Sequence, residues 1–135
     1  MSYDDFITTK SASTSFGGIE PEALHERLFP HQRDLVAWAL RKGRAALFAD
    51  TGLGKSLMEL EWARQVSRFG RVLILTPLAV AQQFVGEGTK FGIGVRYLRE
   101  DDGTTPVVVT NYEMLAHFDP SAFVGIVLDE SSILK

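Results

Sequence analysis

Hydrophobic and polar positions alternate in blocks along this chain, and each block has the length of one strand or helix. Short runs that are apolar almost throughout are typical of strands buried on both faces of a parallel sheet. We expect strands over residues 45–49, 71–76, 95–98, 107–110 and 123–128. Apolar residues recur at helical spacing between them, and we expect helices over residues 30–42, 55–69, 78–87 and 111–118.

This alternation of strands and helices predicts an α/β fold, with a parallel sheet covered by helices on both faces. Ligands of such sheets bind at the carboxyl ends of the strands. Polar clusters follow four of the expected strands, at residues 50–56, at Thr76 and Pro77, at residues 110–112, and at Asp129 and Glu130. The pattern therefore predicts one functional edge of the sheet.

Two details of the helical pattern are specific enough to be checked. Trp38 and Trp62 lie on helical apolar stripes, so we expect both in the core and neither as a platform for stacking bases. Gly86 and Gly88 lower the helix propensity of the third helix, so we expect that helix to weaken near residue 87.

Composition changes this picture little. The chain has 135 residues, of which 45% are hydrophobic and 23% charged, and its net charge is -3, as in an ordinary globular domain. The absence of cysteine excludes disulfides and thiolate metal sites. No apolar run approaches the roughly 18 residues that span a membrane, and the N-terminus does not resemble a secretory signal, so we expect a cytoplasmic location and no membrane partner.

Residues 10–18 are rich in Ser, Thr and Gly, and we expect residues 1–20 to form a flexible arm that can dock through Phe6 and Phe16. Residues 21–135 then form the globular part.

The segment from Ala49 to Ser56 has the pattern of a phosphate-binding loop, because it follows an expected strand and opens an expected helix. Gly52 and Gly54 let the backbone approach a phosphate closely, and the following helix adds its dipole. The expected nucleotide contacts are made by Asp50, Thr51, Gly52, Leu53, Gly54, Lys55 and Ser56. In this pattern the lysine reaches the β- and γ-phosphates, and the Ser56 hydroxyl binds Mg²⁺.

The strand expected over residues 123–128 ends in two adjacent acids, Asp129 and Glu130. Adjacent carboxylates at the end of an apolar strand need solvent or partners. Beside a phosphate loop they have a function: Asp129 holds Mg²⁺, and Glu130 orients and polarises the attacking water. Lys55, Asp129 and Glu130 are the expected catalytic residues. A solvated strand terminus is the alternative interpretation of the acids.

Together these motifs resemble those of superfamily 2 helicases and translocases, over residues 28–135. The resemblance implies a RecA-like P-loop NTPase that uses ATP and Mg²⁺, with an incomplete first lobe that stops after the acidic (Walker B) motif and a second RecA-like lobe outside the chain. The family's acidic motif of the DEAD/DEAH type ends in Asp or His, where this chain has Ser132. The stretch 129–135 is closer to Swi/Snf-type translocases and phage-encoded helicases, which favours a bacterial or phage-infected cell.

The resemblance also implies roles outside the two motifs. Gln32, in the segment 28–33, matches the residue that reads adenine in this family, since a carboxamide both donates and accepts. Its alternative role is that of an exposed residue at a helix start. Residues matching the family's nucleic-acid groove, with double-stranded DNA the favoured partner, are Thr76, Pro77, Thr110, Asn111 and Tyr112. Strand caps and turns are the alternative roles for these five.

Three functions follow from the sequence. The first is ATP hydrolysis that drives translocation on, or remodelling of, nucleic acid. The second is another P-loop enzyme, although the chain has neither a guanine-reading Asn/Thr-Lys-x-Asp segment nor the Arg-rich lid of a kinase. The third is a non-catalytic nucleotide-binding fragment. Because a second lobe supplies arginines in this family, we expect the isolated chain to be poorly active.

Overall fold

The computed structural model of the protein describes residues 18–43, 45–48 and 55–129, with the backbone alone described at 45–48, Lys55 and Asp129. Its α-helices are α2 (Pro30–Lys42), α3 (Lys55–Val66) and α4 (Leu78–Phe91). Its strands are β1 (Ala45–Phe48), β2 (Val72–Thr76), β3 (Arg96–Tyr97), β4 (Val107–Asn111) and β5 (Gly125–Asp129). Two short 3₁₀ helices, η1 (Tyr112–His117) and η2 (Pro120–Ala122), lie between β4 and β5.

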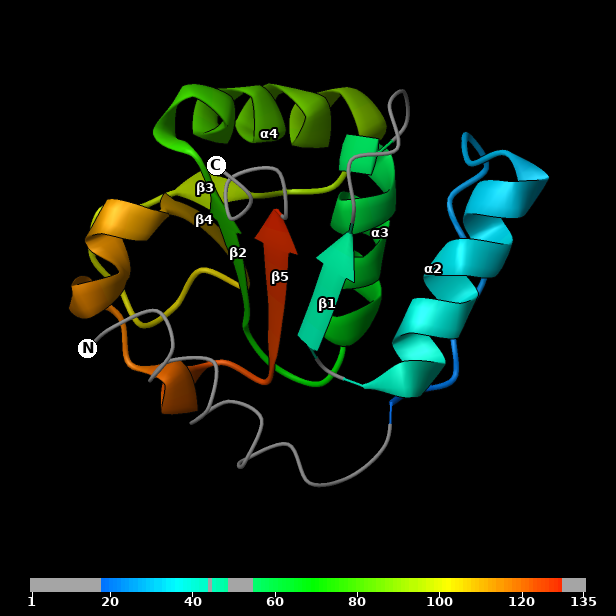
Figure 1. Ribbon diagram of the computed structural model, residues 1–135, viewed down its shortest axis with the longest axis horizontal. Helices are drawn as coiled ribbons and strands as arrows, with labels where there is room; N and C mark the ends of the chain where they lie inside the picture. The colour runs from blue at the N-terminus through cyan, green and yellow to red at the C-terminus, as the bar shows by residue number, and fades with distance from the viewer. Residues whose placement is uncertain (1–17, 44, 49–54, 130–135) are drawn as a thin grey trace.

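The five strands form one sheet in the order β1-β5-β2-β4-β3, and every neighbouring pair is parallel. The predicted α/β fold with a parallel sheet is therefore confirmed, and each expected strand is present. Figure 1 shows the arrowheads of β1 and β5 side by side at one edge, with β2 next in line. We call this edge the carboxyl edge, and the opposite one the amino edge.

Side chains from the two faces of the sheet enter two different cores. On one face, Val72, Ile74 and Val127 pack with residues of α2, α3 and α4. On the other face, Leu73, Leu75 and their neighbours pack with Leu115 and Phe118, which lie in and directly after η1. Both faces are thus covered, but among the described residues the α-helices share one face and only 3₁₀ helices cover the other. The helix expected over residues 111–118 is this 3₁₀ segment.

Helix α3 is the centre of the helical layer. It contacts β2 and β5 on one side and α2 and α4 on others, and Figure 1 shows it between the sheet and α2. Burial on all sides makes its apolar residues core residues, including Trp62, as predicted. It also buries the side chains of Glu59, Glu61 and Gln65, and buried polar groups need hydrogen-bond partners.

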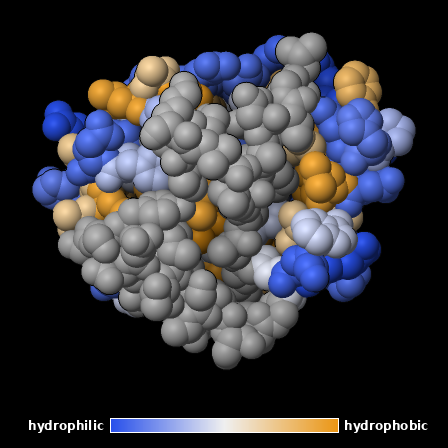
Figure 2. Space-filling model, in the orientation of Figure 1, coloured by the Kyte–Doolittle hydropathy of each residue, from blue (hydrophilic) through white to orange (hydrophobic). Residues whose placement is uncertain are grey.

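The prediction for Trp38 was wrong, because its side chain is 58% exposed. The buried positions of α2 are Gln32, Val36 and Leu40, which are spaced four residues apart and leave Trp38 on the outer side. There Lys42 lies over its indole ring, 5.5 Å from the centroid, an attractive cation–π arrangement. Figure 2 shows the hydrophobic residues of the described surface in separate patches among hydrophilic ones.

Helix α4 runs past the point where it was expected to weaken. It continues to Phe91, and Gly92 ends it with a left-handed φ of 75°, as is common one residue beyond a helix. The helix continues through Gly88, and a glycine is required at this position because there is no space for a side chain. A Cβ atom at this position would meet the Ile93 carbonyl oxygen at 2.5 Å, and the Ile93 amide closes the helix on the Gly88 carbonyl.

Packing against the rest of the protein begins nearer the N-terminus than the expected flexible arm of residues 1–20 implies. Ile19 is buried, and its amide donates to the Leu40 carbonyl at 2.8 Å. Gly18 lies against the last turn of α2, where a Cβ atom would meet the Leu40 carbonyl oxygen at 1.9 Å. Residues 18–20, which we had included in a flexible arm, are therefore held against α2. Residues 1–17, with Phe6 and Phe16, lie outside the described residues.

A polar cluster fixes the amino edge. The Arg71 guanidinium makes a bidentate pair with Asp101, at 2.5 and 3.0 Å, and donates to the Thr105 carbonyl at 2.9 Å. It also lies over the Phe123 ring, 4.7 Å from the centroid. Asp102 accepts from the Thr105 hydroxyl. We call Arg71, Asp101, Asp102 and Thr105 the amino-edge clamp, since it ties the loop before β4 to the start of β2.

No helix among the described residues is both long and apolar enough to cross a membrane.

Candidate functional site

The expected phosphate loop lies between two elements that the structure describes. Strand β1 ends at Phe48 and α3 begins at Lys55, which is the strand-to-helix context that the motif requires. The side chain of Lys55 lies outside the described residues. So do the loop residues themselves, which are Asp50, Thr51, Gly52, Leu53 and Gly54. Ser56 lies in the first turn of α3 and is partly exposed.

The order of the strands brings together the strand ends from which the two expected motifs start. Strand β5 is the parallel neighbour of β1, and Phe48, the last residue of β1, is in register with Asp129, the last residue of β5. Neighbouring strands are about 4.8 Å apart. The segment that follows Phe48 and the acids that begin at Asp129 therefore start side by side at the carboxyl edge. The side chain of Asp129 and the whole of Glu130 lie outside the described residues.

The beginning of α3 is suited to an anion. A helix of 12 residues carries partial positive charge at its N-terminus, where the first amides have no partner within the helix. The first turn of α3 contains no acidic residue that would neutralise this charge. The hydroxyl of Ser56 is the kind of oxygen ligand that Mg²⁺ prefers.

Gln32 lies in the first turn of α2, which begins at Pro30 as predicted. It is 4% exposed, so it is not the exposed helix residue of the alternative interpretation. Its Oε1 accepts a hydrogen bond from the Phe29 amide at 2.8 Å. Because α2 ends next to the start of β1, its first turn lies toward the carboxyl edge, and Figure 1 shows that end of α2 above the arrowhead of β1.

The residues expected to contact nucleic acid gather at the same edge, since Thr76 is in register with Asn111 and Leu75 with Thr110. Thr76, Thr110 and Asn111 are nevertheless buried. Burial of these three places their polar groups inside the protein, while Pro77 and Tyr112 are partly exposed.

Two of the three buried residues, Asn111 and Thr76, direct their polar groups to the protein itself. The Asn111 carboxamide accepts from the Tyr97 hydroxyl at 2.6 Å and donates to Glu113 at 3.2 Å. The Thr76 hydroxyl donates to the Pro77 carbonyl at 2.9 Å. The Thr110 hydroxyl has no hydrogen-bond partner among the described residues. In this conformation these three do not form a surface that a phosphate backbone can reach.

Sequence reasoning missed the segment that precedes Gln32. Residues 18–28, which we call the strap, lie along the helical layer, and Gln65 and His25 hold them by hydrogen bonds. The signal in the sequence was weak: two polar residues, Glu61 and Gln65, are four residues apart in an expected helix that holds other polar residues as well. Such a pair lies on one face of a helix and needs partners there.

No family model matches the chain. It is 32% identical over 141 aligned residues to a Caenorhabditis elegans protein named "SWI/SNF-related matrix-associated actin-dependent regulator of chromatin subfamily A-like protein 1 homolog". The alignment covers 93% of the chain and 20% of that relative, so the chain spans about a fifth of the relative's length. The similarity agrees with the Swi/Snf resemblance of the motifs.

Proposed function

We propose that this chain is the nucleotide-binding part of a superfamily 2 ATPase that moves on, or remodels, nucleic acid. The observation that carries the proposal is the register of Phe48 with Asp129, because it starts the phosphate-loop motif and the acidic motif side by side. The similarity to part of a SWI/SNF-related protein supports the same class.

In this proposal the chain binds the triphosphate at the carboxyl edge. Backbone amides of residues 50–54 and of the first turn of α3 hold the phosphates. Lys55 contacts the β- and γ-phosphates, and Ser56 and Asp129 hold Mg²⁺. Mg²⁺ held there would supply positive charge that stabilises the negative charge developing on the phosphate oxygens during hydrolysis.

Hydrolysis then depends on Glu130. Its carboxylate orients the attacking water and accepts a proton as the water oxygen bonds to the γ-phosphorus. The bond from that phosphorus to the β–γ bridging oxygen breaks, which leaves ADP and inorganic phosphate.

Gln32 is the proposed adenine contact, and because it is buried, it meets a base only if the residues that cover it move aside. Hydrogen bonding of its Oε1 to the Phe29 amide fixes one orientation of the carboxamide, a group that can both donate and accept. A fixed carboxamide discriminates between bases, since hydrogen bonds weaken steeply with angle.

The proposed partners are double-stranded DNA and a second RecA-like lobe. Pro77 and Tyr112 are the better-placed DNA contacts because they are partly exposed; Thr76, Thr110 and Asn111 contact the backbone only if the edge rearranges. A second lobe supplies arginines that raise the hydrolysis rate by several orders of magnitude. Turnover by this chain alone at the rate of a complete motor would contradict that part of the proposal.

The test is a titration of a fluorescent ATP analogue with Mg²⁺ into the parent, Lys55→Ala and Lys42→Ala. The parent and Lys42→Ala, which loses an exposed charge on α2, are expected to bind alike. Lys55→Ala is expected to bind at least about tenfold more weakly, since losing a charged contact costs about 1.5–3 kcal/mol. A folded parent that does not bind, or equal binding by Lys55→Ala, refutes the phosphate-loop assignment.

A further inference from the structure

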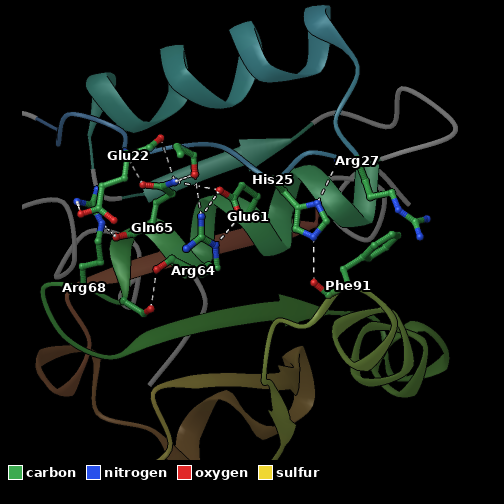
Figure 3. A network of polar contacts seen from close by, with 10 residues as sticks. Glu22, His25, Arg27, Glu61, Arg64, Gln65, Arg68 and Phe91 are labelled. Carbon is green, nitrogen blue, oxygen red and sulfur yellow. Dashed lines mark hydrogen bonds and ion pairs between the residues drawn. The ribbon is translucent and has the colours of Figure 1, made fainter.

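The strap forms a continuous connection from the outer end of α2, across α3, back to the first turn of α2. Its first residues, Gly18 and Ile19, bond to the last turn of α2. Its apolar residues Leu24 and Leu28 pack into the helix-side core. Figure 3 shows the strap residues Glu22 and His25 facing side chains of α3 and the end of α4.

Gln65 attaches the strap to α3. Its Oε1 accepts from the Glu22 amide at 2.9 Å, and its Nε2 is within 3.4 Å of the Glu22 carbonyl and 3.3 Å of the Ala23 carbonyl. The same Nε2 donates to the buried Glu61 at 2.9 Å. One fully buried carboxamide thereby satisfies both an N–H and carbonyl groups of the strap, as a neighbouring strand would.

Glu61 keeps this carboxamide in place. Its carboxylate is completely buried and accepts two hydrogen bonds from Arg64, each at 2.7 Å. Arg64 in turn donates to the Ala23 carbonyl at 3.1 Å. A buried carboxylate requires such pairing, so the charges on α3 and the backbone of the strap form one network.

His25 attaches the strap to the end of α4. Its Nε2 lies 2.9 Å from the Phe91 carbonyl, and the Arg27 amide donates to its Nδ1 at 3.1 Å. Since a carbonyl only accepts and an amide only donates, the two contacts fit the tautomer in which Nε2 donates and Nδ1 accepts. The ring also meets Phe91 edge to face, with centroids 5.6 Å apart.

The strap ends on the proposed adenine contact. The Leu28 amide donates to the His25 carbonyl at 3.2 Å, and Arg33 donates to the Leu28 carbonyl at 3.1 Å. The next amide, that of Phe29, is the one that holds the Gln32 carboxamide. The hydrogen bonds along the strap thus form a series that begins at Gln65 and ends at Gln32, and each bond holds the backbone segment that makes the next one.

From this chain of contacts we infer that Gln65 and His25 are positioning residues for adenine selection. They fix the strap, the strap fixes the Phe29 amide, and that amide orients Gln32 toward the base. The inference rests on the proposed function. It adds that base selection is set from α3, the helix that also opens at the phosphate loop, while phosphate affinity does not depend on the strap.

The experiment compares the Kd of ATP with that of inosine triphosphate, which has an oxygen where adenine has its amino group. Gln65→Met keeps the length of the side chain and the helix propensity but removes every strap bond of Gln65. We expect the parent to prefer ATP by about tenfold, as one well-placed hydrogen bond allows. In Gln65→Met, ATP is expected to bind about 3- to 10-fold more weakly and inosine triphosphate within about twofold of the parent.

Two further variants make the result decisive. Glu20→Gln removes an exposed pair with Arg41 at the other end of the strap and is expected to leave both affinities unchanged. His25→Phe keeps the aromatic contact with Phe91 but loses both hydrogen bonds, and it replaces Gln65→Met if that variant does not fold. A loss of both affinities in parallel, in a folded variant, overturns the inference, because it shows a structural role alone.

The failure of the proposed function has a different signature. A folded parent that binds neither nucleotide refutes the nucleotide site and the inference with it. A parent that binds both nucleotides equally leaves the phosphate loop standing and overturns the inference.

Discussion

The strap network and the amino-edge clamp use the same chemistry for different ends. Both tie distant segments together through networks that contain an arginine–carboxylate pair, Arg64 with Glu61 within α3 and Arg71 with Asp101 across the amino edge. The clamp closes on itself at the amino edge, away from the candidate site. The strap network leads instead to Phe29 and Gln32 at the other end of the molecule. Similar ion pairs can therefore stabilise the fold alone, or stabilise it and also position site residues. The difference is whether the backbone segment bonded to the pair leads to the candidate site.

The largest effect we expect comes from Arg71→Met. The substitution leaves Asp101 without its bidentate partner and the Thr105 carbonyl without its donor. Because charged hydrogen bonds contribute about 1.5–3 kcal/mol each and the pair is partly solvated, we expect the free energy of unfolding to fall by about 2 kcal/mol. Urea unfolding measures the loss. The preference for ATP over inosine triphosphate is expected to stay at the parent value, and a changed preference would break the comparison.

A smaller effect is expected from acid. The Arg71 guanidinium lowers the pKa of Asp101, and the hydroxyl and amide of Thr105 lower the pKa of Asp102. A carboxylate with a lowered pKa in the folded protein stabilises it above its unfolded pKa, about 3.9, and loses that contribution as pH falls further. We therefore expect the free energy of unfolding to decrease as pH falls below about 4.

The Arg71→Met variant serves as the control for this pH dependence. Its decrease in stability between about pH 4 and pH 2 is expected to be shallower, because Asp101 has lost the main cause of its lowered pKa. Equal slopes in the two proteins would show that other carboxylates govern acid unfolding.

The smallest effect is expected from Trp62→Phe. The Trp62 side chain is fully buried, and its indole N–H has no hydrogen-bond acceptor among the described residues. The variant loses buried ring surface but also removes a donor that costs energy to bury. We expect a loss of about 1 kcal/mol in a thermal or urea melt and no change in nucleotide preference. A change in preference would show that α3 positions the strap by more than its polar contacts.

The fold could be predicted from the sequence because its signals are local. Runs such as residues 71–76 and 107–110 are apolar enough to be recognised as buried strands, and Pro30 and Gly43 marked the bounds of α2. The errors came from tertiary contacts. Trp38 is outside because α2 buries only the positions that face α3 and the strap. Gly88 is present because the Ile93 carbonyl leaves no space for a side chain, and its low helix propensity does not end the helix.

The candidate site was predictable in part for the same reason. The local pattern of apolar residues is enough to predict that the two motifs lie at strand ends. The adjacency of β1 and β5 cannot be predicted in this way, because it depends on pairing across 80 residues of sequence, as between Ala45 and Ile126. The strap could not be predicted, because its anchors are side-chain bonds to backbone groups more than 40 residues away. The functional roles of all the site residues remain predictions, and residues 49–54 and 130 also lie outside the described residues.

The most direct test of the account is hydrogen–deuterium exchange with and without saturating ATP and Mg²⁺. The account predicts slower exchange in three separate stretches, residues 28–34, 45–58 and 125–135, because one nucleotide contacts all three. Residues 100–106, in the amino-edge clamp, are expected to exchange at an unchanged rate. Slower exchange in only one of the three stretches, or in the clamp instead, would contradict a single nucleotide site at the carboxyl edge.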